Sequence, residues 1–272
     1  MRKFLRKVYH LPRDIKRYRL NQKYDINLSP IFVLGNQKSG TSAIGALLAE
    51  IADKTVTIDL LGIYEPTQSK LHQGQISFKE FVERNKYDFS REVIKEPSLT
   101  FLYDEIKSYF NSPKNVFIIR NPYDNIRSIL NRVDIPGNVD NISADYKEKW
   151  NHANENWKKV IDSRWLGING ENYIEWMSYR WLRCIEIYEQ NKDDFILIKY
   201  EDFKRDKVNS IKQLAKELNL PIVNDISDKV DIQYQPAGNR SVNKLDFFGE
   251  RNIERINNIC EEKMKEYDYK LL

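Results

Sequence analysis

The chain has 272 residues, of which 41% are hydrophobic and 31% are charged, so it can bury one sizeable core and is not wholly disordered. The 44 basic residues are offset by 40 acidic ones, and the net charge of +4 does not indicate a nucleic-acid-binding protein. No stretch reaches the roughly 18 consecutive apolar residues of a membrane-spanning helix, and the N-terminus lacks the apolar centre of a signal peptide. Cys184 and Cys260 have neither metal-ligand nor disulfide spacing, which fits a reducing compartment. We therefore predict a cytoplasmic protein, either soluble or peripheral to a membrane.

Residues 1–23 are unusually basic: nine are Lys or Arg, and only Asp14 is acidic. Their apolar side chains recur at spacings of four and three, which would place them on one face of a helix, although Pro12 would interrupt that helix. We favour a helix that packs on its own domain. The alternative is a basic arm that lies on anionic lipid or on a partner protein. The predicted division is an N-terminal arm or helix over residues 1–28 and a single domain over residues 29–272.

Strand and helix signals then alternate, as in a parallel sheet with crossover helices. The expected strands are residues 31–34, 55–61, 92–95, 115–120 and 195–200, and the expected helices between them include residues 41–52 and 99–110. These elements predict an α/β fold, a three-layer sandwich with a central parallel sheet flanked by helices. The loops at the carboxyl ends of the strands would meet at one edge, where open α/β sheets bind ligands.

A helical insert is expected over residues of about 131–190, and it contains all five tryptophans. Trp176 and Trp181 lie in a periodic segment and are predicted to pack against the sheet. Trp165, in the stretch "RWLGINGEN", is the better candidate for a ligand pocket because glycines surround it.

The stretch "GNQKSGTS" lies between the first strand and its helix and looks like a phosphate-binding loop. Gly35 and Gly40 have the separation of an ATP-binding loop, but Thr41 occupies the lysine position and Lys38 precedes the second glycine by two residues. Lys38 could still point toward the loop amides, and the start of the helix adds N–H donors for an anion.

A second anion site is predicted after "NVFII", because this strand ends at Arg120 where nucleotide kinases usually place a metal-binding aspartate. Asn121 and Pro122 have the form of a helix start. Ser128 follows two turns later, on a face where its hydroxyl could join Arg120 on one phosphate. The sequence thus offers two phosphate-sized sites and no evident metal site between them.

Together "GNQKSGTS", "VFIIRNPYDNIRSIL" and "LIKYEDF" resemble the successive motifs of the sulfotransferases that use 3′-phosphoadenosine 5′-phosphosulfate (PAPS), over residues of about 31–250. The resemblance implies a P-loop-like fold, PAPS as the sulfate donor and no metal, since a sulfuryl group carries less charge than a phosphoryl group. It also assigns the residues that bind the donor. On the 5′ side they are Lys38, Ser39, Gly40, Thr41 and Ser42, with Lys38 also at the leaving oxygen, and on the 3′-phosphate they are Arg120 and Ser128.

Two further assignments come from the same resemblance. Tyr200 matches a tyrosine near the adenine end of the donor, although a core tyrosine at a strand end is an equal alternative. The stretch "PAGNRSVNKLDFFGE" resembles a late loop that closes over the nucleotide. It implies phosphate contacts from Arg240 and then Lys244, with a solvated basic loop as the alternative.

A catalytic base must accept the proton of the acceptor hydroxyl. The histidine that one branch of the family carries after the third strand is missing from "VIKEPSLT". Glu65, just beyond the second strand, is our first candidate, and Glu96 and His72 are the alternatives. Lys95 of "KEP" resembles a lysine that stabilises the sulfuryl group, which makes it the expected electrostatic partner. Glu65 could instead be a solvated loop carboxylate.

The predicted function is sulfuryl transfer from PAPS to an acceptor hydroxyl, with release of adenosine 3′,5′-bisphosphate. The acceptor would be a small molecule or glycan, and the polar and aromatic loops slightly favour a carbohydrate or glycolipid. Two alternatives stay open at this point: a small-molecule or nucleotide kinase with a divergent loop, and a non-catalytic nucleotide-binding protein.

Overall fold

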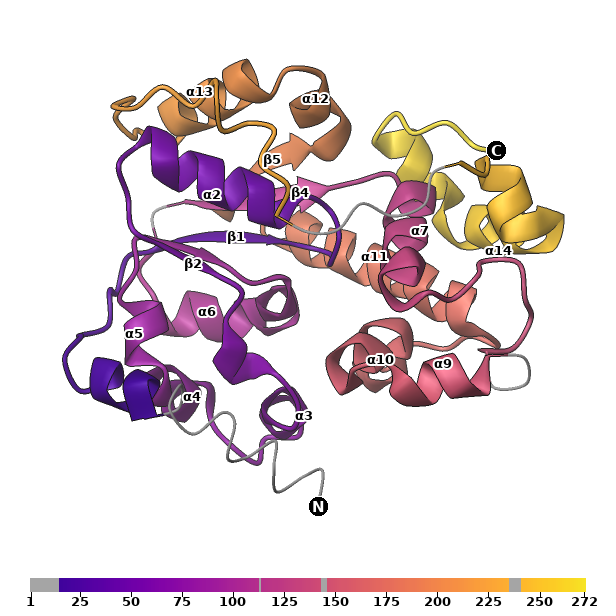
Figure 1. Ribbon diagram of the computed structural model, residues 1–272, viewed down its shortest axis with the longest axis horizontal. Helices are drawn as coiled ribbons and strands as arrows, with labels where there is room; N and C mark the ends of the chain where they lie inside the picture. The colour runs from indigo at the N-terminus through magenta and orange to yellow at the C-terminus, as the bar shows by residue number, and fades with distance from the viewer. Residues whose placement is uncertain (1–14, 113, 143–145, 235–240) are drawn as a thin grey trace.

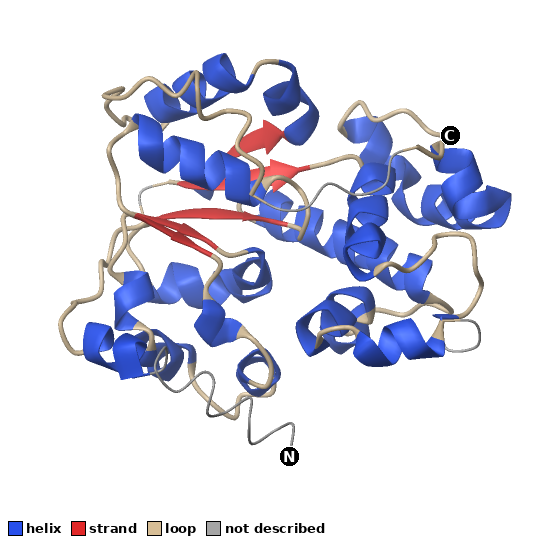
Figure 2. Ribbon diagram, in the orientation of Figure 1, coloured by secondary structure: helices blue, strands red, loops and turns tan. Residues whose placement is uncertain are grey.

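The computed structural model describes residues 15–112, 114–142, 146–234 and 241–272. Five parallel strands form one sheet in the order β2-β3-β1-β4-β5 (Figures 1 and 2). Their bounds are β1 Ile31–Gly35, β2 Val56–Ile58, β3 Val93–Lys95, β4 Asn115–Ile119 and β5 Phe195–Lys199. This arrangement confirms the predicted α/β class and its central parallel sheet.

Apolar side chains on both faces of the sheet give the molecule two cores. Successive residues of a strand point to opposite faces, so Val33 contributes to one core whereas Phe32 and Leu34 contribute to the other. Helices α2 (Thr41–Ile51), α12 (Tyr200–Arg205) and α13 (Lys207–Glu217) cover the first face. The second face is covered by α6 (Tyr103–Tyr109), α7 (Pro122–Val133), α11 (Tyr173–Gln190) and α14 (Lys244–Glu266), among others (Figure 1).

Short helices complete the described chain. They are α3 Thr67–His72, α4 Phe78–Arg84, α5 Lys86–Phe89, α9 Lys147–His152 and α10 Glu155–Ile161, with the 3₁₀ segments η1 Leu61–Ile63, η2 Pro97–Leu102, η3 Ser163–Leu166 and η4 Lys192–Asp194. The helical insert between β4 and β5 therefore consists mainly of α9, α10, η3 and α11. The predicted packing role of Trp181 is confirmed, because it is only 2% exposed.

Two predicted elements were wrong in extent. The second strand was expected over residues 55–61 but ends at Ile58, because Asp59 adopts a left-handed conformation with φ 62° and pairs with Lys95. The helix expected over residues 99–110 begins instead as the 3₁₀ segment η2 and becomes α-helical only at Tyr103. Thr100 in η2 exchanges hydrogen bonds with the backbone of Gly35, which holds this segment against β1.

Strand register brings the predicted site residues to one edge of the sheet. Val33 lies opposite Lys95 on β3 and opposite Val116 on β4. The carboxyl ends of β1, β3 and β4 therefore meet, and the residues that follow them come together. This is the edge at which open α/β sheets bind ligands.

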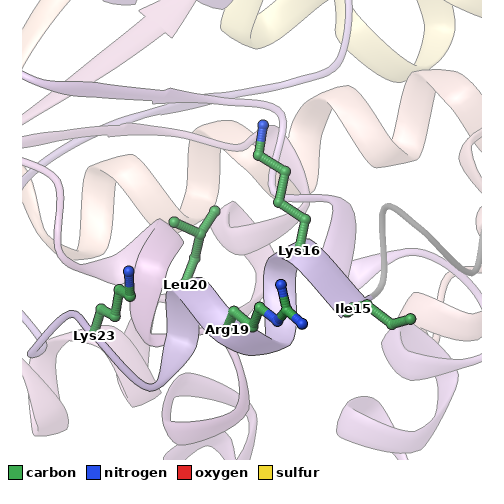
Figure 3. Close-up of a pocket in the computed structure, with 5 residues that line it drawn as sticks. All are labelled: Ile15, Lys16, Arg19, Leu20 and Lys23. Atoms are coloured by element: carbon green, nitrogen blue, oxygen red, sulfur yellow. The ribbon is translucent and has the colours of Figure 1, made fainter.

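The N-terminal residues of the described chain pack on α4 and α5. Residues 15–21 are helical, Arg17 pairs with Asp88, and Asn21 hydrogen-bonds to backbone atoms of Arg84 and Tyr87. A small surface hollow of about 280 Å³ is lined by Ile15, Lys16, Arg19, Leu20 and Lys23 (Figure 3). The contacts of Arg17 and Asn21 support a helix that packs on its own domain, and the lysine and arginine side chains at the hollow give that helix a basic face. Residues 1–14 lie outside the described residues, and contact of this segment with a membrane stays a prediction.

None of the described helices is both long and apolar enough to cross a membrane.

Gly35 gives a direct test of how closely β1 and β4 approach. Its φ of +133° is rare for other residues, and a Cβ there would lie 2.4 Å from the carbonyl oxygen of Ile118. We predict that Gly35→Ala lowers the free energy of unfolding by about 2–4 kcal/mol. Urea denaturation measures this. Gly167→Ala is the matched control, because Gly167 also has a positive φ but nothing within 4 Å of its Cβ position, and it should cost about 1 kcal/mol. Equal losses in the two variants would contradict the prediction.

Candidate functional site

The loop between β1 and α2 has the geometry of an anion site. Lys38 and Gly40 both have positive φ angles, 66° and 94°, which turns successive backbone N–H groups toward a common centre. Helix α2 begins at Thr41 with no side-chain cap and no acidic residue in its first turn. Its first amides and partial positive charge therefore face the loop, where they can hold a phosphate or sulfate group.

Arg120 joins this loop to the end of β4. Its Nη1 donates a hydrogen bond to the carbonyl oxygen of Lys38, and its guanidinium lies 4.6 Å from the centre of the Tyr200 ring. The indole of Trp181 donates a hydrogen bond of 2.8 Å to the carbonyl oxygen of Arg120. A Cβ on Gly40 would lie 2.3 Å from the Tyr200 ring, so that ring packs directly on the loop. The two predicted anion sites are thus parts of one connected structure.

Helix α7 extends from the Arg120 side of the site. Asn121 caps the helix by accepting a hydrogen bond from the backbone of Tyr123, as the sequence predicted. Ser128 is half-buried two turns into the helix. Lys244, at the start of α14, pairs with Asp124 in the first turn of α7 at 2.9 Å. This pair joins the start of α14 to α7. Lys244, which the sequence analysis predicted to contact a phosphate, thus already has an acidic partner. Arg240 lies outside the described residues.

The carboxyl ends of β2 and β3 carry an ion pair. The Lys95 side chain is 3% exposed and pairs with Asp59, which the sequence analysis had not singled out. Glu96 is buried, and its two carboxylate oxygens accept backbone hydrogen bonds from Ser98 at 2.9 Å and from Leu60 at 3.0 Å. Burial raises the pKa of Glu96. Glu96 therefore braces two loops, and this role accounts for both of its oxygens.

The other predicted base, Glu65, lies against the helical insert. Its backbone N–H donates to Asn156 on α10, and its Oε1 lies 3.3 Å from Lys159 Nζ. That contact is an ion pair that lacks hydrogen-bond geometry, and Lys159 also donates a hydrogen bond to Ser69. Among the described residues nothing hydrogen-bonds to Glu65 Oε1, although the atom is buried. The hydrogen-bonding capacity of this oxygen is therefore not used by the described residues.

His72 and Trp165 form an aromatic wall beside Glu65. Their ring centres are 4.3 Å apart, and Lys159 Nζ lies 5.2 Å from the centre of the Trp165 indole. Burial, with the nearby charges of Lys159 and Arg180, lowers the pKa of His72 to about 4. The imidazole is then neutral at pH 7 and a weak base.

Positive charge dominates the centre of the site. Burial, followed by the charges of Arg132, Arg120 and Lys95, lowers the pKa of Lys38 from 10.5 to about 8. Arg132, one turn after Ser128, is a further residue that the sequence analysis missed, and its guanidinium stacks 5.8 Å from the centre of the Trp157 ring. A spacing of four residues from Ser128 was the signal that could have indicated it.

The arrangement suits a polyanionic ligand. Backbone amides, Lys38 and Arg120 converge where two negatively charged groups could be held, and carboxylates lie to one side, after β2. Within the described ranges, no group of three or more His, Cys, Asp or Glu side chains could hold a metal ion.

Comparisons with known proteins give a family and a fold for this chain. The sulfotransferase domain family matches residues 28–268, which is most of the chain. No curated protein sequence matches significantly.

The structure of sulfotransferase STF9 from Mycobacterium avium is 13% identical, with a TM-score of 0.56 over 94% of this chain and 81% of that one, and supports the fold. Mouse sulfotransferase SULT7A1, solved with PAP, is 15% identical with a TM-score of 0.48, over 93% of this chain and 89% of that one. The sulfotransferase from Alicyclobacillus acidocaldarius is 13% identical with a TM-score of 0.46, over 87% and 97%. The chain belongs to the sulfotransferase family and is a PAPS-dependent sulfotransferase.

Proposed function

We propose that this enzyme transfers the sulfuryl group of PAPS to a hydroxyl of a small-molecule or glycan acceptor, and that a carbohydrate is the favoured class. The observation that carries the proposal is the connection of the Lys38 loop to Arg120. A polar and aromatic group of Glu65, Lys159 and Trp165 is linked to this loop through Arg180, which hydrogen-bonds to Asn36 and lies 5.9 Å from the centre of the Trp165 ring. Aromatic faces flanked by charged and hydroxyl groups suit the mixed apolar and polar surface of a sugar.

The Lys38 loop, Arg120 and Ser128 keep the roles that the resemblance implied. The α2 amides with Ser39, Thr41 and Ser42 hold the 5′ group, and Arg120 with Ser128 holds the 3′-phosphate. Tyr200 supports the loop from the side of Gly40, and Lys244 acts through its pair with Asp124. The geometry supports these roles because Arg120 reaches the loop and α7 begins beside it.

PAPS supplies an activated sulfuryl group whose leaving group is a phosphate oxygen. Lys38 neutralises the charge that accumulates on that oxygen, and Lys95 adds a second positive charge from the end of β3. A carboxylate after β2 accepts the proton that the acceptor hydroxyl loses as its oxygen bonds to sulfur. No metal is needed for these roles, because the charges are met by lysine, arginine and backbone amides.

Glu65 is our proposed base because it lies in the loop after β2, at the edge of the sheet where the donor-binding candidates gather, and because no described residue hydrogen-bonds to its Oε1. Asp59 is the rival that the structure introduces. It immediately follows β2, and its partner Lys95 lies on β3, the neighbour of the loop-bearing strand β1. A lysine-paired carboxylate at that position is a second candidate to accept the proton of the acceptor hydroxyl.

The lowered pKa of Lys38 makes donor binding sensitive to pH. A bound 5′-phosphate favours the charged amine, so binding takes up a proton once the free amine has lost it. The affinity for adenosine 3′,5′-bisphosphate should therefore be constant near pH 7 and fall above pH of about 8, approaching about tenfold per pH unit. Isothermal titration calorimetry measures this. Lys38→Met should bind more weakly with a flatter profile, and an equal decline in both proteins would exclude Lys38 as its cause.

The base assignment is tested by sulfuryl transfer from radiolabelled PAPS to a panel of sugars, phenols and primary alcohols. Glu65→Gln should lower the transfer rate by about 10²–10⁴-fold, and its affinity for the bisphosphate should not change. Glu155→Gln is the control, because Glu155 is a well-exposed carboxylate on α10 that pairs with Lys158 on the same helix. A wild-type rate for Glu65→Gln together with a strong loss for Asp59→Asn would move the assignment to Asp59.

A further inference from the structure

Arg180 on α11 is a fully buried arginine without an acidic partner. Its relative exposure is 0%, and among the described residues no carboxylate lies within 4.0 Å of its guanidinium. Burying a cation costs free energy unless other groups satisfy it, and arginine is almost never fully buried without a pair. Burial lowers the pKa of Arg180 to about 10, which still leaves it charged at pH 7. Its position therefore needs an explanation in the groups that it contacts.

The guanidinium divides its hydrogen bonds between two segments. Nε donates to Asn36 Oδ1 at 2.9 Å and Nη2 donates to Gln37 Oε1 at 2.5 Å, so two of its bonds go to the residues just before Lys38. Nη1 donates to Ser163 Oγ at 3.3 Å, at the start of the η3 segment that carries Trp165. The ring of Phe101 lies 4.4 Å from the guanidinium carbon and covers one of its faces.

These two loop side chains continue into a buried network. Asn36 donates to Asn125 on α7 at 2.9 Å. Asn125 in turn donates to the carbonyl oxygen of Gln37 at 2.8 Å and to Ser39 Oγ at 3.0 Å. Gln37 donates to Ser98 Oγ at 3.2 Å. The orientation of Ser39 and of the loop backbone around Lys38 therefore depends on the side-chain amides of Asn36 and Gln37, which Arg180 holds by hydrogen bonds from the core.

We propose that Arg180 is a positioning residue that sets the conformation of the donor loop through Asn36 and Gln37 and couples it to the Ser163 segment of the insert. The inference rests on the donor-binding role of the loop and is independent of the acceptor and of the catalytic base. A planar guanidinium can serve three acceptors in fixed directions, whereas a lysine ammonium offers a point charge on a flexible stem. The loop therefore requires the fixed, planar arrangement of the guanidinium N–H donors and not the positive charge alone.

The test is the affinity for adenosine 3′,5′-bisphosphate, measured by calorimetry on Arg180→Lys and Arg180→Met, with melting temperatures recorded in parallel. We expect both variants to lose about tenfold or more in affinity at a temperature where they are folded. Arg183→Met is the matched control, because Arg183 lies on the same helix, pairs with Glu186 and has 44% of its side chain exposed. Its affinity should stay within about twofold of wild type.

Gln37→Leu removes the loop side of the hydrogen bond between Arg180 and Gln37 and leaves Arg180 in place. If neither Arg180 variant folds, this variant alone tests whether the contact controls donor affinity. It should also lower the affinity, and the double variant with Arg180→Met should be no weaker than Arg180→Met alone, because both changes remove one interaction. Variants that melt at lower temperature yet bind the bisphosphate like wild type would overturn the proposal and leave Arg180 with a core role only. A wild-type protein that fails to bind the bisphosphate would instead overturn the donor site itself.

Discussion

The contact between Arg120 and the carbonyl oxygen of Lys38 is the interaction on which the site depends. It joins the end of β4 to the loop after β1, so the two places proposed to hold the 5′ and 3′ groups of the nucleotide are fixed relative to each other. Trp181 holds Arg120 from the insert, and Tyr200 supports both Arg120 and Gly40 from the end of β5. Elements from distant parts of the sequence thus meet at one arginine, which links the assembly of the sheet to the geometry of the donor site.

The two sides of the site are built differently. The donor side rests on buried amides, hydroxyls and Arg180, whose hydrogen bonds have few alternatives once water is excluded. The acceptor side rests on ion pairs between side chains of different elements, Glu65 with Lys159 and Asp59 with Lys95. This difference suits an enzyme that keeps one donor geometry while its acceptor loops determine specificity.

The sequence predicted those parts of the site that depend on adjacent residues. The loop around Lys38 and the strand end at Arg120 were recognisable because the residues that define each of them are consecutive in the sequence. The short β2 and the 3₁₀ start of η2 were missed, since they depend on the Asp59–Lys95 pair and on hydrogen bonds between Thr100 and Gly35. Arg180 could not be found at all, because its partners Asn36 and Gln37 lie 144 and 143 positions earlier in the chain. Periodicity reports which side chains are buried, but not which polar groups meet across the core.

The central claim is that Arg120 maintains the 5′ site as well as the 3′ site. The direct measurement is calorimetric binding of adenosine 3′,5′-bisphosphate and of adenosine 5′-monophosphate to the wild type and to Arg120→Met, under conditions where both proteins are folded. Because Arg120 also holds the Lys38 loop, the account predicts that the variant binds both nucleotides more weakly, including the one without a 3′-phosphate. If only the bisphosphate loses affinity and the monophosphate binds as to the wild type, Arg120 serves the 3′-phosphate alone and the account is contradicted.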